Sequence, residues 1–507
     1  MIENNFIYQT HDELIAELII AGKPIAELVK QIVDLYLSDD RSWVIGFSGG
    51  KDSTCVLSLV FTALIKISPE KRNKPIYVVS SDTLVETPVV VDLINKVLDI
   101  INDKAAELKL PISAHPVHPA IDQTFWVNLL GRGYPAPQQT FRWCTERMKI
   151  NPVSEFITDK VAKHGEVIVA LGSRSKESAS RSQVIDKHQI KGSLLARHTS
   201  LPNAYTYMPI VDWDADDVWE YLMSAPCPWG GTNETLFELY KGSNQGECPL
   251  VIDKSTPSCG NSRFGCWTCT VVTKDKALHG LIESGEEWMR PLLEFRNDLH
   301  NSTRPEKKDK YRNFKRRTGK VSYQKGSISD EITGDKKHVP GPYWLKQRKK
   351  WLKRLLEIEK GIKASGQDLN LIQRKELVAI RNQWLQDPNE PDWMDSLPAI
   401  FSEVYPEESI VWDKSHLRQF SEEDNNVLKL LCEEEDIVPE MIVKLLSLES
   451  EMSGLSVRRD FFSKLERILN GDWGTLEQIN TKNKRRIAVD IWEDTLQELR
   501  NELKEVR

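Results

Sequence analysis

A short segment with two adjacent glycines carries the clearest chemical signal in the sequence. It reads Ser48-Gly49-Gly50-Lys51-Asp52-Ser53 and directly follows an apolar run at residues 43–47. Adjacent glycines tolerate positive φ angles, so their backbone N–H groups can turn together toward an anion. The helix expected after the loop adds the positive end of its dipole, and we expect Lys51 to add a cation exposed in the crevice. The segment therefore predicts a phosphate-binding loop.

The order of residues separates this loop from the Walker A motif. A Walker A loop has Gly five residues before the Gly of its Gly-Lys pair and Ser or Thr after the Lys, whereas this chain has Ile45 and Asp52 there. The loop instead resembles the signature of the PP-loop ATP pyrophosphatases, which split ATP between its α and β phosphates. This resemblance implies that residues 48–53 bind ATP with Mg²⁺. Lys51, Asp52 and Arg174 are then the candidate catalytic residues.

Asp82 follows the second apolar run, in the segment Ser80-Ser81-Asp82-Thr83. Members of the PP-loop superfamily line their nucleotide pocket at this point, which makes Asp82 a candidate ATP-binding residue. A carboxylate here can equally cap the helix that follows. The sequence leaves both roles open.

Two further segments supply cations suited to phosphate or sulfate oxygens. Residues 141–149 resemble the Cys-Thr-x-x-x-Lys element of the sulfonucleotide (PAPS/APS) reductases, and residues 171–181 resemble a second element of these enzymes. The candidate phosphate- or substrate-binding residues are Arg142, Lys149, Arg174 and Arg181. Surface salt bridges are the alternative role for each of them.

Four of the eight cysteines lie between Cys248 and Cys269, and three of these form a C-x6-C-x2-C run. A [4Fe–4S] cluster needs four thiolates that converge from loops. We expect Cys259, Cys266 and Cys269 to be metal ligands and Cys144 to be the fourth, with Cys248 as its competitor. A cluster with three cysteine ligands and one open iron that could hold sulfide, a tetrahedral Zn²⁺ site and unligated thiols are the alternatives.

Short apolar runs alternate with segments of helical periodicity in the first part of the chain. The expected strands are 43–47, 75–80, 112–117 and 167–172, and the expected helices include 54–67, 87–108 and 146–164. This alternation predicts an α/β fold with a doubly wound parallel sheet and helices on both faces, as in HUP-like PP-loop proteins. Ligands of such sheets bind beyond the carboxyl ends of the strands.

The pattern divides the chain into five expected regions. They are N-terminal helices at 1–40, a PP-loop ATP pyrophosphatase domain at 41–240, a cysteine-rich iron–sulfur region at 241–300, a basic linker at 301–342 and a mostly helical C-terminal domain at 343–507. Residues 176–300 show less regular periodicity than the rest.

Length and composition exclude several classes of protein. The chain has 507 residues, of which 40% are hydrophobic and 28% charged, so it can bury a core without a disulfide scaffold. No apolar run is long enough to span a membrane. The first residues lack the features of a signal peptide, so we expect a cytoplasmic protein.

The formal charge of −7 is unevenly distributed. Residues 304–354, the basic block, carry 18 Lys or Arg and 5 Asp or Glu, a local charge of +13 that leaves −20 on the rest of the chain. Such a block is typical of a nucleic-acid contact, and a solvated helical face is the alternative.

Three longer strings resemble DndC, the family of sulfurtransferase subunits of bacterial DNA phosphorothioation. They are residues 79–86 (Val-Ser-Ser-Asp-Thr-Leu-Val-Glu), 125–135 (Phe-Trp-Val-Asn-Leu-Leu-Gly-Arg-Gly-Tyr-Pro) and 258–269 (Ser-Cys-Gly-Asn-Ser-Arg-Phe-Gly-Cys-Trp-Thr-Cys). The resemblance implies an ATP-dependent enzyme that helps to replace a non-bridging phosphate oxygen of DNA by sulfur. It also implies a cysteine desulfurase as sulfur donor and the other subunits of the modification complex as partners.

Three other functions are open from the sequence. A sulfonucleotide reductase shares the loop and the Cys-Thr element, but its Glu-Cys-Gly-Leu/Ile-His tail is missing, since the last cysteine, Cys432, lies in Leu-Leu-Cys-Glu-Glu-Glu. A tRNA-thiolating enzyme would use the same loop, and the basic block suits RNA as well as DNA. A non-catalytic iron–sulfur or zinc scaffold is the third, and it would tolerate Lys51→Ala.

Overall fold

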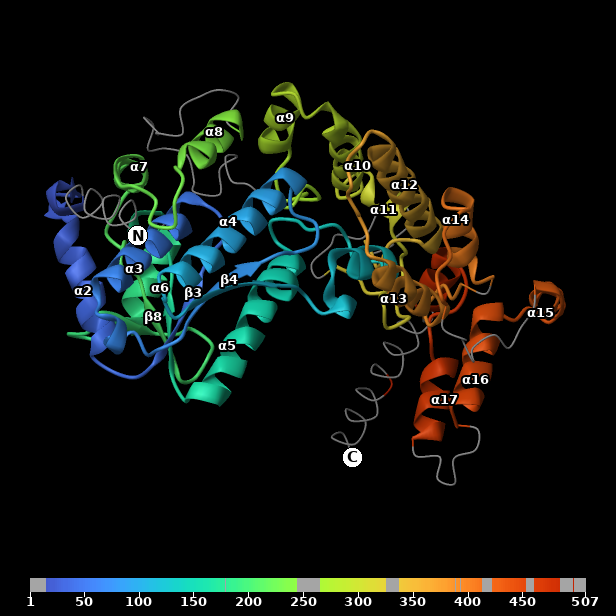
Figure 1. Cartoon of the computed structure of the whole chain (residues 1–507). Coiled ribbons are helices and arrows are strands. Elements are labelled where there is room, and N and C mark those ends of the chain that lie inside the picture. The colour runs from blue at the N-terminus through green and yellow to red at the C-terminus, as the bar shows by residue number, and fades with distance from the viewer. Residues whose placement is uncertain are drawn as a thin grey trace, which may run out of the picture. The chain divides into compact units, whose positions relative to one another are not determined.

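The computed structural model describes residues 15–177, 179–243, 265–324, 337–387, 389–392, 394–412, 422–452, 460–483 and 496. The chain folds into two compact units, which Figure 1 shows in one view. Unit 1 comprises residues 1–125, 137–300 and 361–371, and unit 2 comprises residues 126–136, 301–360 and 372–507. Residues 126–136 thus belong to the same unit as the C-terminal helices.

Unit 1 is built on a six-stranded sheet with the spatial order β5-β4-β3-β6-β8-β7. Its strands are β3 (Ser42–Gly46), β4 (Ile76–Ser81), β5 (Ile112–Val117), β6 (Val167–Ala170), β7 (Leu195–Arg197) and β8 (Ala204–Tyr207). All neighbouring strands are parallel except the edge strand β7, which is antiparallel to β8. A separate antiparallel ribbon pairs β1 (Ile19–Ile20) with β2 (Lys23–Pro24).

Helices cover both faces of this sheet. The helices of unit 1 are α2 (Ile25–Leu37), α3 (Lys51–Lys66), α4 (Pro88–Glu107), α5 (Asn151–His164), α6 (Ala179–His188), α7 (Ala215–Ser224), α8 (Glu234–Ser243), α9 (Lys276–Glu283) and α10 (Arg290–Asn301). Trp43 and Ile45 of β3 share a core with α2, α3, α4 and α7. Val44 points to the other face, where it shares a core with Ile157 of α5. In Figure 1, α3 and α4 accordingly lie on one side of the sheet and α5 on the other.

The predicted α/β fold with a mainly parallel sheet is confirmed, and the four predicted strands lie within two residues of their observed ends. Strands β7 and β8 were not predicted. They have three and four residues, which is too short for a periodic pattern to stand out from a loop. Their addition extends the sheet beyond β6, and β7 makes its edge antiparallel.

Unit 2 consists mainly of helices. They are α11 (Lys308–Tyr311), α12 (Leu345–Ala364, in unit 2 up to Lys360), α13 (Arg374–Leu385), α14 (Ser396–Val404), α15 (Glu422–Glu434), α16 (Pro439–Met452) and α17 (Phe461–Leu469). Residues 126–136 join this unit through buried polar contacts, because Trp384 Nε1 donates to the Leu130 carbonyl and Arg348 Nη1 to the Gly131 carbonyl, each at 2.7 Å. Within the described ranges, no helix combines the length and apolarity needed to cross a membrane.

Candidate active site

Hydroxyl groups shape the loop between β3 and α3. Ser48 N–H donates to Ser53 Oγ at 3.1 Å, and Ser53 Oγ donates to the Gly50 carbonyl at 2.9 Å. These bonds fold the loop over the first turn of α3. Gly49 has a φ of +68°, and a Cβ there would lie 2.5 Å from Ile94 Cγ1. Position 49 therefore requires glycine, and the loop has the form predicted from its sequence.

The loop lies at the point where the strand order changes direction. After β3 the chain forms β4 and β5 on one side and then returns to place β6 on the other side. In parallel sheets, the crevice at the carboxyl ends of the strands beside such a point is the usual ligand site. The segment that follows β6 packs against the start of α3, because a Cβ on Gly172 would lie 2.7 Å from the carbonyl carbon and oxygen of Asp52.

Asp52 joins the two candidate catalytic cations. Lys51 Nζ donates to Asp52 Oδ2 at 2.8 Å, and Arg174 Nε donates to Asp52 Oδ1 at 2.7 Å. The three candidate catalytic residues therefore form one contiguous group, although 122 positions separate Asp52 from Arg174. This arrangement can place two cations beside a phosphate group while one carboxylate fixes their positions.

The expectation that Lys51 is exposed is wrong, since only 14% of its side chain is accessible to solvent. Burial lowers the pKa of Lys51, the neighbouring Asp52 opposes that shift, and Arg174 adds to it. Burial thus outweighs the ion pair, so the folded protein holds this ammonium group at a cost. A phosphate group would supply the missing counter-charge.

Tyr240 of α8 is a site residue that the sequence did not reveal. Its hydroxyl accepts a hydrogen bond from Lys51 N–H at 3.4 Å, and it would lie 3.2 Å from a Cβ on Gly50. Burial raises the pKa of Tyr240 to about 12, so the phenol is neutral and can donate to a phosphate oxygen. No local pattern predicts it, because 189 positions separate the two contacting residues.

Asp82 does not cap α4. The residue before that helix is Thr87, which makes no side-chain cap, while Asp82 Oδ1 accepts from Leu84 N–H at 2.8 Å. His118 Nδ1 lies 3.5 Å from Asp82 Oδ2. Burial raises the pKa of Asp82, and the Leu84 N–H and His118 oppose that shift. Of the two roles left open by the sequence, the cap is wrong and nucleotide binding stays a prediction.

The turn after β4 touches the cysteine-rich segment. Thr87 Oγ1 donates to the Gly265 carbonyl at 2.9 Å, and Thr83 Oγ1 lies 3.3 Å from Cys266 Sγ. Glu86 Oε1 lies 3.7 Å from the same sulfur. Gly265 and Cys266 are therefore held at the edge of the sheet that also carries the phosphate loop.

Lys149 lies in this second group. Its Nζ forms an ion pair with Glu86 Oε1 at 2.9 Å. Burial alone would lower the pKa of Lys149, but the nearby Cys266 and Cys144 thiols and Glu86 raise it. Lys149 is thus held as a cation beside two thiols, which is a position suited to an anionic sulfur or phosphate group.

The structure brings three of the predicted metal ligands into one region. Burial raises the pKa values of Cys144 and Cys266, and the nearby Cys269 raises both pKa values further. In the part of the chain that the structure describes, no three Cys, His, Asp or Glu side chains form a ready metal-binding group. Cys259 and Cys248 lie outside the described residues, so the choice of the fourth ligand stays a prediction.

Arg142 and Arg181 are the two remaining candidate arginines. Arg142 is exposed, just before the π-helical turn Thr145–Ile150. Arg181 lies on α6, and its side chain is outside the described residues. A role for either residue in phosphate binding stays a prediction.

The range that contains all these residues matches one known domain family. Residues 42–272 match the family model of the phosphoadenosine phosphosulfate reductase domain. Residues 42–272 form a PAPS reductase-like domain. This places the loop in the PP-loop superfamily, as its sequence predicted, and it supports an enzyme. The match identifies the broader domain family and does not distinguish the DNA-modifying sulfurtransferases that the longer strings resemble.

The chain matches only part of the length of two curated relatives. Two uncharacterized proteins of Methanocaldococcus jannaschii are 27% and 25% identical to the chain over 207 and 243 residues. The matches cover 41% and 48% of this chain and 36% and 44% of the relatives, so the chain spans less than half the length of either relative.

Two enzymes are among the solved structures to which part of the chain is similar. A phosphoadenylyl-sulfate (PAPS) reductase from Candida auris is 14% identical, with coverage of 40% of this chain and 87% of that chain and a TM-score of 0.25. A U34-tRNA thiolase from Methanococcus maripaludis, solved with its [4Fe–4S] cluster, is 13% identical, with coverage of 55% and 80% and a TM-score of 0.27.

The cysteines of the PAPS reductase-like domain support a direct prediction about metal content. Replacing Cys266 by serine should remove most of the iron and acid-labile sulfide from protein purified without oxygen, because a hydroxyl is a poor ligand for a [4Fe–4S] cluster. Cys432→Ser is the matched control, since Cys432 is buried in α15 of unit 2 and has no metal-like spacing. Equal iron content in the two variants would contradict the ligand assignment, and zinc without iron would support the zinc alternative.

Proposed function

We propose that the chain is an ATP-dependent sulfurtransferase that acts in DNA phosphorothioation. The observation that carries this proposal is the contact between the turn after β4 and the cysteine-rich segment, because it places thiols and the phosphate loop at one edge of one sheet. An enzyme that couples ATP cleavage to sulfur transfer needs both groups close together. The choice of DNA as substrate is supported by the three strings that resemble DndC.

The proposed reaction follows from leaving-group chemistry. Oxide is a very poor leaving group from a phosphodiester. Attack by a non-bridging DNA oxygen on the α-phosphorus of ATP releases pyrophosphate and leaves AMP on that oxygen. A sulfide-level nucleophile then attacks the DNA phosphorus, and AMP leaves with the former DNA oxygen. The product carries sulfur in place of one non-bridging oxygen.

The side chains of unit 1 suit the first of these steps. The loop at 48–53 and the N-terminus of α3 would bind the triphosphate with its Mg²⁺. Lys51 and Arg174, held by Asp52, would stabilise the charge that develops on the phosphoryl oxygens. Tyr240 would donate its hydroxyl to a phosphate oxygen.

The second step needs a sulfur source near the same crevice. Cys144, Cys266 and Cys269, together with Cys259 or Cys248, would hold a [4Fe–4S] cluster, and buried thiols are soft donors that suit iron. Such a cluster would supply a place to store or deliver sulfur. Lys149 and Cys266 both contact Glu86, so Lys149 would hold an anionic group near this thiol. A cysteine desulfurase would provide the sulfur as a persulfide, and a thiol reductant would supply the two electrons that bring this sulfur to the sulfide level. Other subunits of the modification complex would select the site on DNA.

Mass spectrometry of nuclease-digested DNA tests this proposal. The DNA would come from cells that express the complete gene neighbourhood with the intact chain, with Lys51→Ala or with Cys266→Ala. We expect phosphorothioate-linked dinucleotides with the intact chain and none with either variant, since one variant loses ATP activation and the other loses sulfur handling. Full modification with Lys51→Ala would refute an enzymatic role for the loop.

Sulfonucleotide reduction is the second candidate, because the domain match itself is to that family. To test it, the intact chain would be purified and incubated with PAPS and a thiol reductant, and the sulfite released would be measured. Sulfite release, with no sulfur in DNA from a host that supports the modification, would favour the reductase. Sulfur in tRNA with none in DNA would favour tRNA thiolation.

A further inference from the structure

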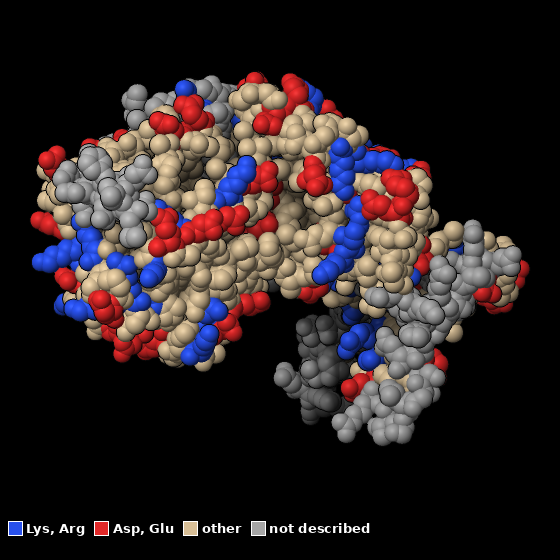
Figure 2. All heavy atoms as spheres, in the orientation of Figure 1, with Lys and Arg blue, Asp and Glu red and all other residues tan. Residues whose placement is uncertain are grey.

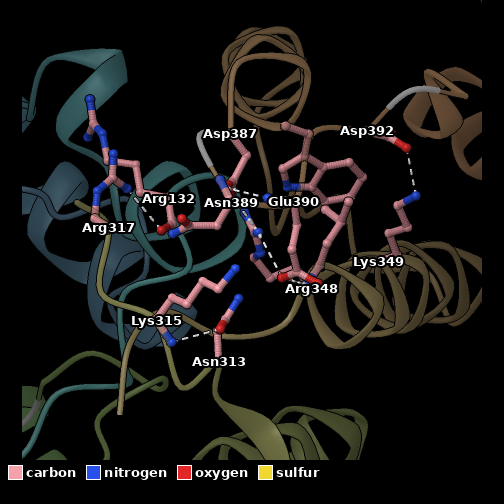
Figure 3. A network of polar contacts seen from close by, with 12 residues as sticks. Arg132, Asn313, Lys315, Arg317, Arg348, Lys349, Asp387, Asn389, Glu390 and Asp392 are labelled. Carbon is pink, nitrogen blue, oxygen red and sulfur yellow. Dashed lines mark hydrogen bonds and ion pairs between the residues drawn. The ribbon is translucent and has the colours of Figure 1, made fainter. Parts of the chain in front are cut away.

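The cations of the basic block differ in whether the fold pairs them with carboxylates. Along α12, cations are paired with carboxylates: Arg348 with Asp387 at 2.7 Å and Lys349 with Asp392 at 2.6 Å. Figure 3 shows both pairs. On the face drawn in Figure 2, Lys and Arg side chains likewise have Asp and Glu side chains beside them. Arg348, Lys349 and Lys353 of α12 are therefore neutralised within the fold.

A tight turn at residues 315–321, which we call the basic turn, is different. Lys315 and Val321 form an isolated antiparallel bridge, and the turn is closed by hydrogen bonds of 2.8 Å from Arg316 N–H to the Lys320 carbonyl and from Gly319 N–H to the Arg316 carbonyl. Val321 N–H also donates to Asp472 Oδ2 at 2.6 Å. The backbone of the turn is thus fixed, while Arg316, Arg317 and Lys320 are exposed.

Contacts with unit 2 position the cations of this turn. Arg317 Nη1 donates to the Arg132 carbonyl at 3.0 Å, and its guanidinium lies 5.6 Å from the centre of the Tyr134 ring. Figure 3 shows the side chains of Arg132 and Arg317 side by side. Among the described residues, no carboxylate lies within ion-pair distance of Arg317. Its charge is therefore positioned but not neutralised.

Two lysines of unit 2 lie near the same aromatic ring. Lys315 Nζ lies 5.4 Å and Lys444 Nζ 5.0 Å from the centre of the Trp473 ring. Neither ammonium group forms an ion pair with a carboxylate in the described part of the chain. Burial lowers the pKa values of both lysines, although Glu440, Asp472 and Glu390 oppose the shift at Lys315 and Asp387 opposes it at Lys444. The ring and the fold thus hold two like charges near each other.

We propose that the basic turn, together with Lys444, binds the phosphodiester backbone of duplex DNA. This inference rests on the proposed function. Arginine matches phosphate in a bidentate geometry and lysine acts as a point charge, so both suit a backbone rather than a base sequence. The chain carries −7 overall, so a polyanion must approach it where cations lack carboxylate partners. The basic turn is such a place, and the paired cations of α12 are not.

Fluorescence anisotropy of a short labelled DNA duplex tests this inference with the full chain. The test variant is Arg317→Gln with Lys444→Met, which removes two charges while keeping side chains of similar length. The matched control is Lys349→Met with Lys353→Met, which removes two cations of α12 that are paired with Asp392 and Glu403 in the same basic block. Melting curves would establish that both double variants fold.

We expect the test variant to lose affinity roughly tenfold at low salt and its salt slope to become shallower by about two units, since each phosphate contact contributes close to one unit. The control should bind like the intact chain. Equal losses of affinity in the two variants, or no loss in either, would overturn the inference. The proposed function would still stand in that case if the intact chain binds DNA. An intact chain that binds tRNA but not duplex DNA would overturn both.

Discussion

Replacing Lys51 by alanine should slow ATP cleavage by about 10²- to 10³-fold, the usual effect of losing one preorganised charge at a reacting oxygen. The melting temperature should change little. Burial lowers the pKa of Lys51 despite the ion pair with Asp52, so the buried charge itself does not stabilise the fold. Asp52 keeps its second partner, Arg174, in the variant. Pyrophosphate release and thermal unfolding would measure the two effects.

The pH dependence of stability provides an independent check on this residue. A lysine whose pKa is lower in the folded state binds fewer protons there than in the unfolded chain. The free energy of unfolding of the intact protein should therefore rise as pH increases from the lowered pKa of Lys51 to its ordinary value near 10.5, and Lys51→Ala should lack this contribution. Lys66→Ala, in the last turn of the same helix and exposed, should behave like the intact chain. A large fall in melting temperature with Lys51→Ala would contradict this account.

Replacing Gly172 by alanine should abolish ATP cleavage and lower stability. The new Cβ would lie 2.7 Å from the carbonyl carbon and oxygen of Asp52 and 3.0 Å from Ser53 N. These are backbone atoms, so they cannot swing aside as the end of a side chain can. The segment after β6 must then move away from α3, which separates Arg174 from Asp52. Forcing an extra methyl into such a contact costs about 1–3 kcal/mol, measurable by chemical denaturation.

Gly361→Ala is the matched control for this substitution. Gly361 lies within α12 and has no atom within 4 Å of a Cβ built on it. Alanine there should leave ATP cleavage unchanged and raise stability by up to about 1 kcal/mol, because glycine is a poor residue in a helix interior. Normal ATP cleavage by Gly172→Ala would show that the close approach of the two segments is not needed for the site.

The sequence by itself determined the features that depend on neighbouring residues. The loop at 48–53 was predicted because its glycines and its flanking strand and helix are adjacent in the chain, and four strands of the sheet were predicted because each is a compact apolar run. The short strands β7 and β8 were missed, since pairing with a neighbour rather than their own pattern makes them strands. The parallel sheet in turn indicated which edge carries the ligand site.

Only the tertiary structure decided which distant residues meet at that edge. Asp52 pairs with Arg174 across 122 positions, and Tyr240 reaches Lys51 across 189. No local pattern carries such contacts, because they depend on how closely two packed segments approach each other. The same reason explains why Lys51 is half-buried rather than exposed and why Asp82 does not cap α4. It also explains why the basic block contains both neutralised and available cations: a charge count sums along the chain, whereas ion pairs form between segments that the fold brings together.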